Sequence, residues 1–263
     1  ANWLLRLGVK KGDHIGLYMR NRLEMLEILY AISTCGAVAV PINYMVQGND
    51  LAKLIEDSDS QYIFVEVEQL PAFEKIQAQL QRVTPERTIV VGAPSPAQGY
   101  VDYEQLMATG SKEDPGVEVT SDDVAVILFS SGTTSLPKGI VVSQGKWLFR
   151  VVLCALEWNV NYKDVILLTV PMYHSVGHAF ACYLSVIGSK LVITRDFNAE
   201  DTLRQIEKHR VTHAFFVPTQ YILMLQVPAF DQYDLSSLKL LISAAAPLAE
   251  VTKRQIVERF KTE

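Results

Sequence analysis

A hydroxyl-rich segment follows a strongly apolar run in the middle of this chain. Residues 124–129 read VAVILF, and residues 130–139 read SSGTTSLPKG, with five hydroxyl side chains, two glycines and a lysine. Hydroxyl groups and the backbone N–H groups beside a glycine are donors that can surround the oxygens of a phosphate. The ammonium group of Lys138 could neutralise charge that develops on a leaving phosphate. The segment therefore favours a pyrophosphate-binding loop at the end of a buried strand, with an ordinary turn as the alternative.

The segment departs from the phosphate-binding loop of P-loop NTPases. That loop has the pattern G-x-x-x-x-G-K-[ST] and leads into a helix. Here Pro137 stands where the second glycine is required, and Gly139 stands where Ser or Thr is required. The following residues 140–142 read IVV, which is typical of a strand. The sequence therefore argues against a P-loop NTPase.

Two histidines, His174 and His178, stand four residues apart in the segment HSVGH. Zinc-binding helices use the same spacing in the pattern H-E-x-x-H, but the glutamate is missing here and no third ligand stands nearby. We therefore expect no metal site at these residues. Two interpretations are open for each histidine. His174 is either packed in the core or lines a ligand pocket, and His178 is either an ordinary helix residue or part of the wall of the same pocket.

Composition and charge restrict the class of protein. The chain has 263 residues, of which 49% are hydrophobic and 20% charged, so it can bury a full core. Its net charge of −5 argues against nucleic-acid binding, which needs a basic face. The longest apolar stretches fall short of the roughly 20 residues that a membrane span needs, so we expect no stable membrane insertion. The three cysteines, Cys35, Cys154 and Cys182, have no paired spacing, which is typical of a reducing compartment and predicts a cytoplasmic protein.

Short apolar runs alternate with amphipathic stretches along most of the chain, as in α/β proteins whose parallel sheets are covered on both faces. Strands are expected at 14–19, 37–40, 62–65, 88–91, 124–129, 140–142, 165–170, 190–194, 212–217 and 238–243. Helices are expected at 22–34, 51–56, 73–83, 103–107, 145–157, 177–187, 199–209, 219–226 and 248–260. Gly36 would end the first of these helices in a left-handed conformation, and Asn49 would cap the second.

These elements predict two packed α/β lobes with mostly parallel sheets flanked by helices. The first lobe would span residues 1–150 and end in the loop 130–139. The second would span residues 151–263 and be incomplete at its C-terminus.

The loop and three later segments resemble those of the adenylate-forming enzymes, which include acyl-CoA synthetases, luciferases and adenylation domains. The phosphate loop of that superfamily reads S-G-T-T-G-x-P-K-G after an aromatic residue or Thr, and residues 129–139 fit it except that Ser135 replaces a glycine. Residues 170–177 (VPMYHSVG) resemble its P-x-[FY]-H segment, and residues 217–219 (VPT) resemble its V-P-T segment. Residues 243–248 (SAAAPL) resemble its S-G-[GA]-A-P-L segment. The resemblance covers nearly the whole chain and is closest to acyl-CoA ligases.

The resemblance implies a two-step reaction that uses ATP, Mg²⁺ and coenzyme A and belongs to fatty acid metabolism. A carboxylate would attack the α-phosphate of ATP and release pyrophosphate, and the acyl-adenylate would then pass to the thiol of coenzyme A. The nucleotide would be bound by Ser130, Ser131, Gly132, Thr133, Thr134, Ser135, Lys138, Ala244, Ala245, Ala246 and Pro247. The second lobe would line the substrate pocket with His174, Val176, His178, Thr219 and Ala244. His174 and Lys138 would be the catalytic residues, and the methyl group of Ala244, which replaces a glycine, would narrow the pocket that it faces.

The acid itself is expected to carry no amino group. Amino-acid adenylation domains typically place an Asp near the start of the pocket helix, but no acidic residue stands between Pro171 and Cys182. An unpaired ammonium group would be costly to bury. A fatty or aryl acid is therefore favoured, and coenzyme A is the expected acceptor. The alternatives are an amino-acid or carrier-protein adenylation domain and a non-catalytic relative that binds nucleotide.

Both ends of the sequence lead us to expect a fragment, because it does not begin with Met and ends in the charged run 258–263. The resemblance implies further nucleotide-binding and metal-binding motifs and a small C-terminal domain with a catalytic Lys, none of which can be placed in these residues. We expect the fragment to fold, and to make neither acyl-adenylate nor thioester.

Overall fold

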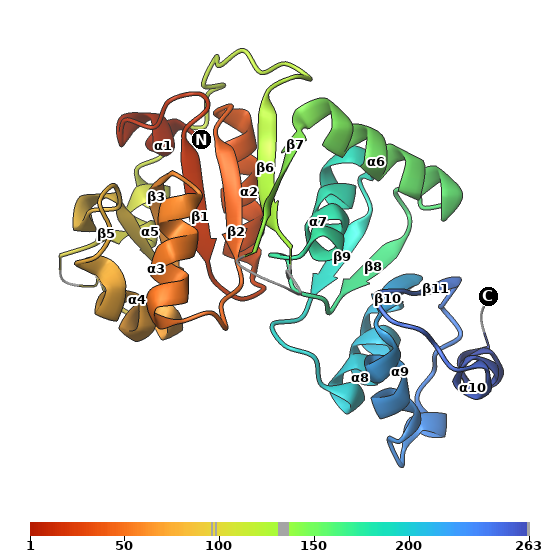
Figure 1. Ribbon diagram of the computed structural model, residues 1–263. Helices are drawn as coiled ribbons and strands as arrows, with labels where there is room; N and C mark the ends of the chain where they lie inside the picture. Colours follow the sequence, from red (N-terminus) through yellow and green to blue (C-terminus); the bar gives the residue numbers. More distant parts are fainter. Residues whose placement is uncertain (96, 98, 131–136, 262–263) are drawn as a thin grey trace. The chain divides into compact units, whose positions relative to one another are not determined.

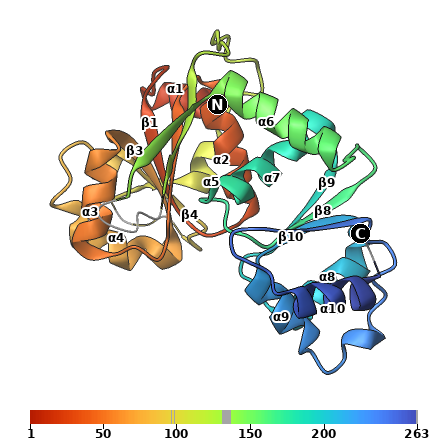
Figure 2. The same ribbon diagram turned by 45° about the vertical axis from the view of Figure 1, so that its right-hand side comes forward.

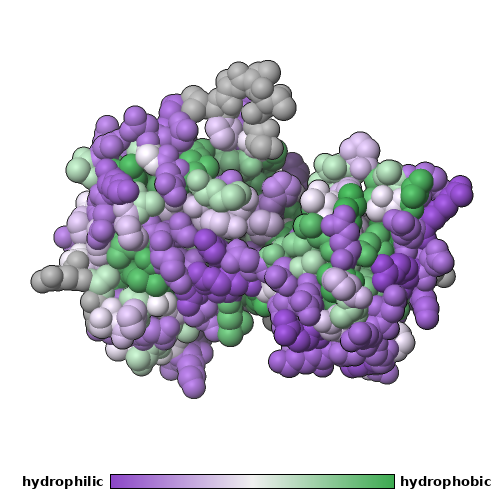
Figure 3. All heavy atoms as spheres, turned by 90° about the horizontal axis from the view of Figure 1, so that it is seen from below, coloured by the Kyte–Doolittle hydropathy of each residue, from purple (hydrophilic) through white to green (hydrophobic). Residues whose placement is uncertain are grey.

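A computed structural model of the chain describes residues 1–95, 97, 99–130 and 137–261. The chain divides into two compact units, residues 1–148 and 149–263, and each unit contains one sheet (Figure 1). Helix α6 (Gln144–Glu157) begins in the first unit and ends in the second. On the face shown in Figure 3, hydrophilic residues surround smaller patches of hydrophobic ones. Within the described residues, no helix combines the length and the apolar character that crossing a bilayer requires.

The first unit is built on a seven-stranded sheet with the order β5-β4-β3-β1-β2-β6-β7. Its strands are β1 (His14–Tyr18), β2 (Val38–Ile42), β3 (Ser60–Glu66), β4 (Thr88–Val91), β5 (Val101–Asp102), β6 (Val124–Phe129) and β7 (Gly139–Ser143). All are parallel except β7, which pairs antiparallel with β6. Its helices are α1 (Asn2–Arg6), α2 (Leu23–Thr34), α3 (Gly48–Asp57), α4 (Leu70–Gln77) and α5 (Tyr103–Ala108).

Apolar packing explains why these residues form a sheet covered by helices. Strand β2 is buried along its whole length, as expected for a parallel strand with helices on both faces. Residues Leu51 and Ile55 of α3 and Phe73 of α4 pack in one cluster with Ile63 of β3 and other strand residues. After α2 the chain turns at Gly36, whose φ of +65° confirms the left-handed conformation predicted for it.

The second unit contains a four-stranded parallel sheet with the order β11-β10-β8-β9. Its strands are β8 (Val165–Leu168), β9 (Lys190–Ile193), β10 (His213–Phe216) and β11 (Leu240–Ser243). Its remaining helices are α7 (Ser175–Ile187), α8 (Ala199–His209), α9 (Pro218–Leu225) and α10 (Glu250–Phe260). Helix α7 lies on one face of the sheet, and α8 and α9 lie on the other (Figure 2).

A buried carboxylate fixes the amino-terminal edge of this second sheet. Asp164 directly precedes β8, and its side chain is fully buried. It accepts a hydrogen bond of 2.6 Å from Nζ of Lys239, which precedes β11, and two bonds from Asn161. Burial alone would raise the pKa of Asp164, but these hydrogen bonds and the neighbouring His213 outweigh burial and hold that pKa below its ordinary value. One charged cluster therefore joins the starts of β8, β10 and β11.

The predicted fold class, mixed α/β with mostly parallel sheets flanked by helices, is confirmed, and two local predictions are wrong. The helix expected at 73–83 is α4, which begins earlier at Leu70 because Pro71 fits the first turn of a helix. Asn49 does not cap α3; it lies within the first turn, and Gln47 is the N-cap residue.

Candidate functional site

The hydroxyl-rich loop joins two paired strands of the first unit. Phe129 of β6 is paired with Gly139 of β7, and the N–H of Ser130 donates a 3.0 Å hydrogen bond to the carbonyl of Lys138. The loop therefore connects strand to strand, as the β-branched residues after it predicted, and differs from the strand-to-helix loop of a P-loop NTPase. The base of the loop is held by regular antiparallel pairing.

The predicted phosphate-binding residues are described only at the two ends of this loop. Ser130 is half-buried, and the side chain of Lys138 is exposed to solvent. The central residues lie outside the described part of the chain: Ser131, Gly132, Thr133, Thr134 and Ser135. Their role in holding phosphate stays a prediction.

The strand order of the second sheet marks an edge where ligands commonly bind. The chain runs from β8 outward to β9, then returns past β8 to β10 and continues to β11. In open parallel sheets, ligands bind outside the carboxyl ends of the strands where the order reverses in this way. In this unit the reversal falls between β8 and β10, so the residues that follow these two strands are the candidates.

All three predicted pocket segments leave the sheet at this carboxyl edge. Residues 169–174 follow β8, residues 217–219 follow β10, and residues 244–247 follow β11. Because the three strands are parallel neighbours, the structure brings these segments to the same side of the unit. His174, Thr219 and Ala244 are all exposed there, so they are open to a ligand.

The connection between β8 and α7 presents His174 at the surface. The His174 N–H donates to the carbonyl of Pro171 at 3.1 Å, and the His174 carbonyl accepts from the N–H of His178 at 2.9 Å. The side chain of His174 is exposed, so the alternative of a histidine packed in the core is wrong. Val176, in the first turn of α7, is half-buried.

Gly177 lets this connection fold back onto the helix. The carbonyl oxygen of Pro171 occupies the place where a side chain at Gly177 would begin, and Cα of Met172 lies 2.9 Å from it. No residue with a β-carbon can sit there without moving the backbone that leads to His174. No role was predicted for Gly177, although a glycine in the first turn of an expected helix is a signal for such a close approach of two backbone segments.

His178 is buried on α7. Only 6% of its surface is exposed, and burial together with the nearby positive charge of Arg150 lowers the pKa of His178 from 6.5 to about 4. The imidazole is therefore neutral at pH 7. Its assignment to the wall of the substrate pocket stays a prediction.

Two neighbouring residues of α9 connect the strands at this edge. Oε1 of Gln220 accepts from the N–H of Val217 at 3.1 Å, and its Nε2 donates to Oγ1 of Thr169 at 3.4 Å, which links the ends of β10 and β8. The hydroxyl of Tyr221 donates to the carbonyl of Ile242 in β11 at 3.0 Å. The side chain of Tyr221 is 1% exposed, and the connecting roles of Gln220 and Tyr221 were not predicted from the sequence.

The segment after β11 contains a strained residue. Residues 244–247 are exposed, and Ala245 has a φ of +74°, in the left-handed region that favours glycine. The narrowing of a pocket that was predicted for the methyl group of Ala244, where the motif has glycine, stays a prediction. The backbone shows that the unusual conformation falls one residue later.

Mg²⁺, which the resemblance implies, finds no set of ligands here. Across residues 1–95, 97, 99–130 and 137–261, no three His, Cys, Asp or Glu side chains are grouped closely enough to hold a metal ion.

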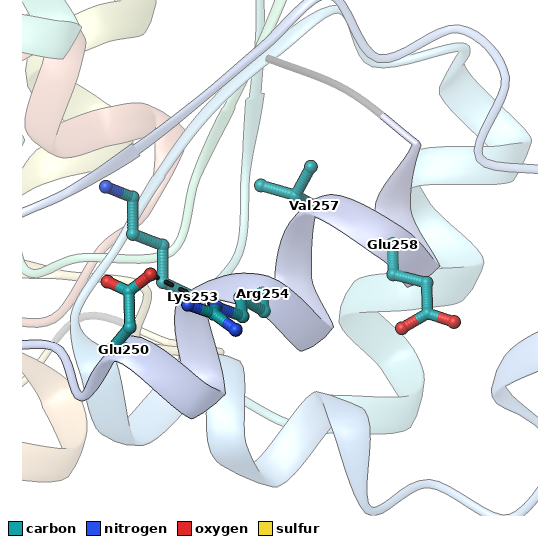
Figure 4. Close-up of a pocket in the computed structure, with 5 residues that line it drawn as sticks. All are labelled: Glu250, Lys253, Arg254, Val257 and Glu258. Carbon is teal, nitrogen blue, oxygen red and sulfur yellow. Dashed lines mark hydrogen bonds and ion pairs between the residues drawn. The ribbon is translucent and has the colours of Figure 1, made fainter.

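A hollow lies on helix α10 (Figure 4). It has a volume of about 270 Å³ and is lined by Glu250, Lys253, Arg254, Val257 and Glu258. All five side chains come from one helix, and Glu250 pairs with Arg254 at 3.2 Å. A ligand site normally draws its lining from several elements, so this hollow is a surface feature of the helix.

Known proteins resemble this chain over its whole length. Its sequence is 30% identical over 252 residues to the long-chain-fatty-acid–CoA ligase FadD13 of Mycobacterium tuberculosis, and the aligned region covers 95% of this chain and 48% of that protein. It is 29% identical over 266 residues to the 4-coumarate–CoA ligase CCL1 of Humulus lupulus, and the aligned region covers 99% of this chain and 48% of that protein. The chain thus spans about half the length of the curated relatives it matches.

A solved structure and a family model agree with these relatives. The N-terminal domain of FACL13 from Mycobacterium tuberculosis superimposes with a TM-score of 0.86 at 26% identity, over 100% of this chain and 64% of that one. The sequence model described as AMP-binding enzyme matches residues 1–263. The chain belongs to the AMP-binding enzyme family.

Proposed function

We propose that this chain forms the acid-binding and nucleotide-binding part of an AMP-forming acyl-CoA synthetase. The observation that carries the proposal is the meeting of three motif segments at the carboxyl edge of the second sheet, in a chain that matches the AMP-binding enzyme family from end to end. Two similar proteins are named as a long-chain-fatty-acid–CoA ligase and a 4-coumarate–CoA ligase, names that describe enzymes joining a carboxylic acid to coenzyme A.

The first step forms an acyl-adenylate. A carboxylate oxygen of the acid attacks the α-phosphorus of ATP, the bond from that phosphorus to the bridging oxygen breaks, and pyrophosphate leaves. Catalysis of such displacements consists mainly of positioning and of stabilising the charge on the leaving group. Lys138 and the donors of the loop 130–138 would perform this role on the β- and γ-phosphates.

The second step transfers the acyl group to sulfur. The thiolate of coenzyme A attacks the acyl carbonyl carbon, the bond to the adenylate oxygen breaks, and AMP leaves. His174 is exposed at the start of α7, where it would border the carboxylate and the path of the thiol. Thr219 and Ala244–Pro247 would line the acyl and adenine parts of the pocket.

The proposed substrate is a fatty or aryl acid without an amino group. An amino acid would bring an ammonium group that needs an acidic partner. The residues from Pro171 to Cys182, which include the exposed His174 and the first half of α7, contain no Asp or Glu. The same residues can accept an uncharged acyl chain or ring.

The test is ATP–pyrophosphate exchange by the complete protein that carries this chain. Separate reactions contain saturated fatty acids of increasing length, cinnamate-type aryl acids, or amino acids, and thioester formation is followed after addition of coenzyme A. Exchange with fatty or aryl acids and a CoA thioester product are expected. Exchange driven by amino acids would make the protein an amino-acid adenylation enzyme, and exchange without transfer to coenzyme A would indicate a carrier-protein acceptor. If none of the acids supports exchange, the protein would be a non-catalytic relative that binds nucleotide.

A further inference from the structure

Tyr221 connects helix α9 to strand β11, which leads into residues 244–247, the segment that the proposed function assigns to the nucleotide. Its side chain is 1% exposed, and its ring packs edge-on against Phe216 and Phe260 at centroid distances of 5.3 and 6.0 Å. These contacts fix the ring, so its hydroxyl is aimed at the carbonyl of Ile242, to which it donates at 3.0 Å. Burial raises the pKa of Tyr221, so the hydroxyl keeps its proton and remains a donor.

The strained Ala245 lies three residues beyond Ile242. A residue with a β-carbon adopts a φ of +74° only where its surroundings determine that conformation. On one side, pairing of Ser243 with Phe216 holds the end of β11. On the other side, Leu248 packs against the core cluster that contains Tyr221 itself. The turn at Ala245 is therefore held between two attachments to the same core.

We propose that Tyr221 is a positioning residue for the nucleotide pocket: through the carbonyl of Ile242, its hydroxyl holds the segment 243–246 in the strained turn at Ala245. The proposal rests on the proposed function, because that function assigns residues 244–247 to the nucleotide. Tyr221 would not touch ATP. It would hold the end of β11 in a position from which the chain reaches Leu248 most favourably with Ala245 in its left-handed conformation.

Tyr221→Phe removes the hydroxyl and keeps the ring with its packing. Loss of one hydrogen bond of this kind changes an equilibrium by about three- to tenfold, so we expect the KM for ATP in pyrophosphate exchange to rise by about that factor. Turnover at saturating ATP is expected to stay near the wild-type value, because the reacting groups are unchanged. Tyr233→Phe is the matched control, since Tyr233 also donates its hydroxyl to a protein group, Oε1 of Glu200 at 3.3 Å, but on the surface of the unit.

Ala245→Gly provides the decisive comparison, because glycine adopts the turn without strain. In the wild-type background this substitution should raise stability, as relief of strain predicts. In the Tyr221→Phe background, the same substitution should change the unfolding equilibrium constant by a factor at least three times smaller than in the wild type, because the turn has already relaxed. It should also restore much of the ATP affinity lost in Tyr221→Phe, which a general weakening of the core would not allow.

Both readouts are measured in the complete protein, so failures can be told apart. Unfolding in urea gives the stability cycle whether or not the protein is active. Additive stability effects of Tyr221→Phe and Ala245→Gly would overturn the proposal. Coupled stabilities with an unchanged KM for ATP would overturn the role in nucleotide binding. Wild-type protein without exchange activity on any acid would refute the proposed function, and with it the nucleotide half of this inference, while the cycle would still decide the connection to Ala245.

Discussion

Replacing Gly177 with alanine tests how closely the β8–α7 connection packs on its helix. Gly177 is buried, and a β-carbon at this position would meet three backbone atoms closer than 3.0 Å: the carbonyl oxygen and carbon of Pro171 and Cα of Met172. A clash with the end of a flexible side chain is relieved by rotation, but a clash with backbone is not. The connection that leads to His174 would therefore have to move.

Two opposing effects decide the size of the change. Alanine is favoured over glycine in a helix by about 1 kcal/mol. Overpacking in a close-packed site costs about 1–3 kcal/mol, and more when backbone has to shift. Because all three contacts involve backbone, we place the packing cost at the upper end and expect the free energy of unfolding to fall by about 2 kcal/mol. Displacement of His174 should also lower the rate of thioester formation.

Urea denaturation of the complete protein measures the first effect, and steady-state turnover measures the second. Gly110→Ala is the control, since the nearest atoms to its added methyl group lie at 3.5 Å, an ordinary contact distance. The control should be as stable as the wild type within about 0.5 kcal/mol. A Gly177→Ala protein that matches or exceeds wild-type stability with unchanged turnover would refute the packing described for this connection.

Three further predictions concern ionisable groups. The free energy of unfolding should fall by up to about 3 kcal/mol as the pH drops from 6.5 toward 4. In this range the unfolded chain binds a proton at His178, whereas the folded chain, in which the pKa of His178 is lowered to about 4, does not. His178→Gln should make the free energy of unfolding, measured in a pH series, depend less on pH in this range. Asp164→Ala should cost about 2–3 kcal/mol in urea unfolding, because the hydrogen bonds from Asn161 and from the ammonium group of Lys239 to the buried carboxylate are lost, and a loss below 1 kcal/mol would contradict the buried cluster. Lys138→Ala should weaken ATP binding about tenfold or more by titration, as loss of a charge-assisted contact does, whereas the exposed Lys146→Ala should not.

The alternation of apolar runs and amphipathic stretches predicted the fold because both sheets are covered by helices. A strand such as β2 is buried on both faces and is therefore apolar at every position, which the sequence displays directly. Errors arose where burial and secondary structure differ. Val83 is buried in the first core, but it lies beyond the end of α4, so its spacing extended the predicted helix too far. Strand β5 was not predicted, because two residues are too few to show a period.

The candidate site divides in the same way. Segments with a motif, such as residues 170–174 and 243–247, could be located from the sequence, and the parallel sheet explains why they share an edge. The residues that hold these segments could not be located. Gln220 reaches Thr169 across 51 positions and Tyr221 reaches Ile242 across 21, and neither contact leaves a local pattern. Such contacts depend on which strands become neighbours, which the order of elements alone does not determine.

The two edges of the second sheet have separate tasks, and this has a consequence for how the protein can change. The amino-terminal edge holds the buried cluster around Asp164, while the pocket segments leave from the opposite edge. Substitutions in the segments proposed to line the pocket lie a full strand length away from that cluster, and the effects of distant substitutions on stability usually add independently. If these segments bind the acid as proposed, residues at the carboxyl edge could change while the cluster that keeps the strands aligned is retained. Selection for a new substrate could then act at the carboxyl edge while the cluster around Asp164 stays unchanged.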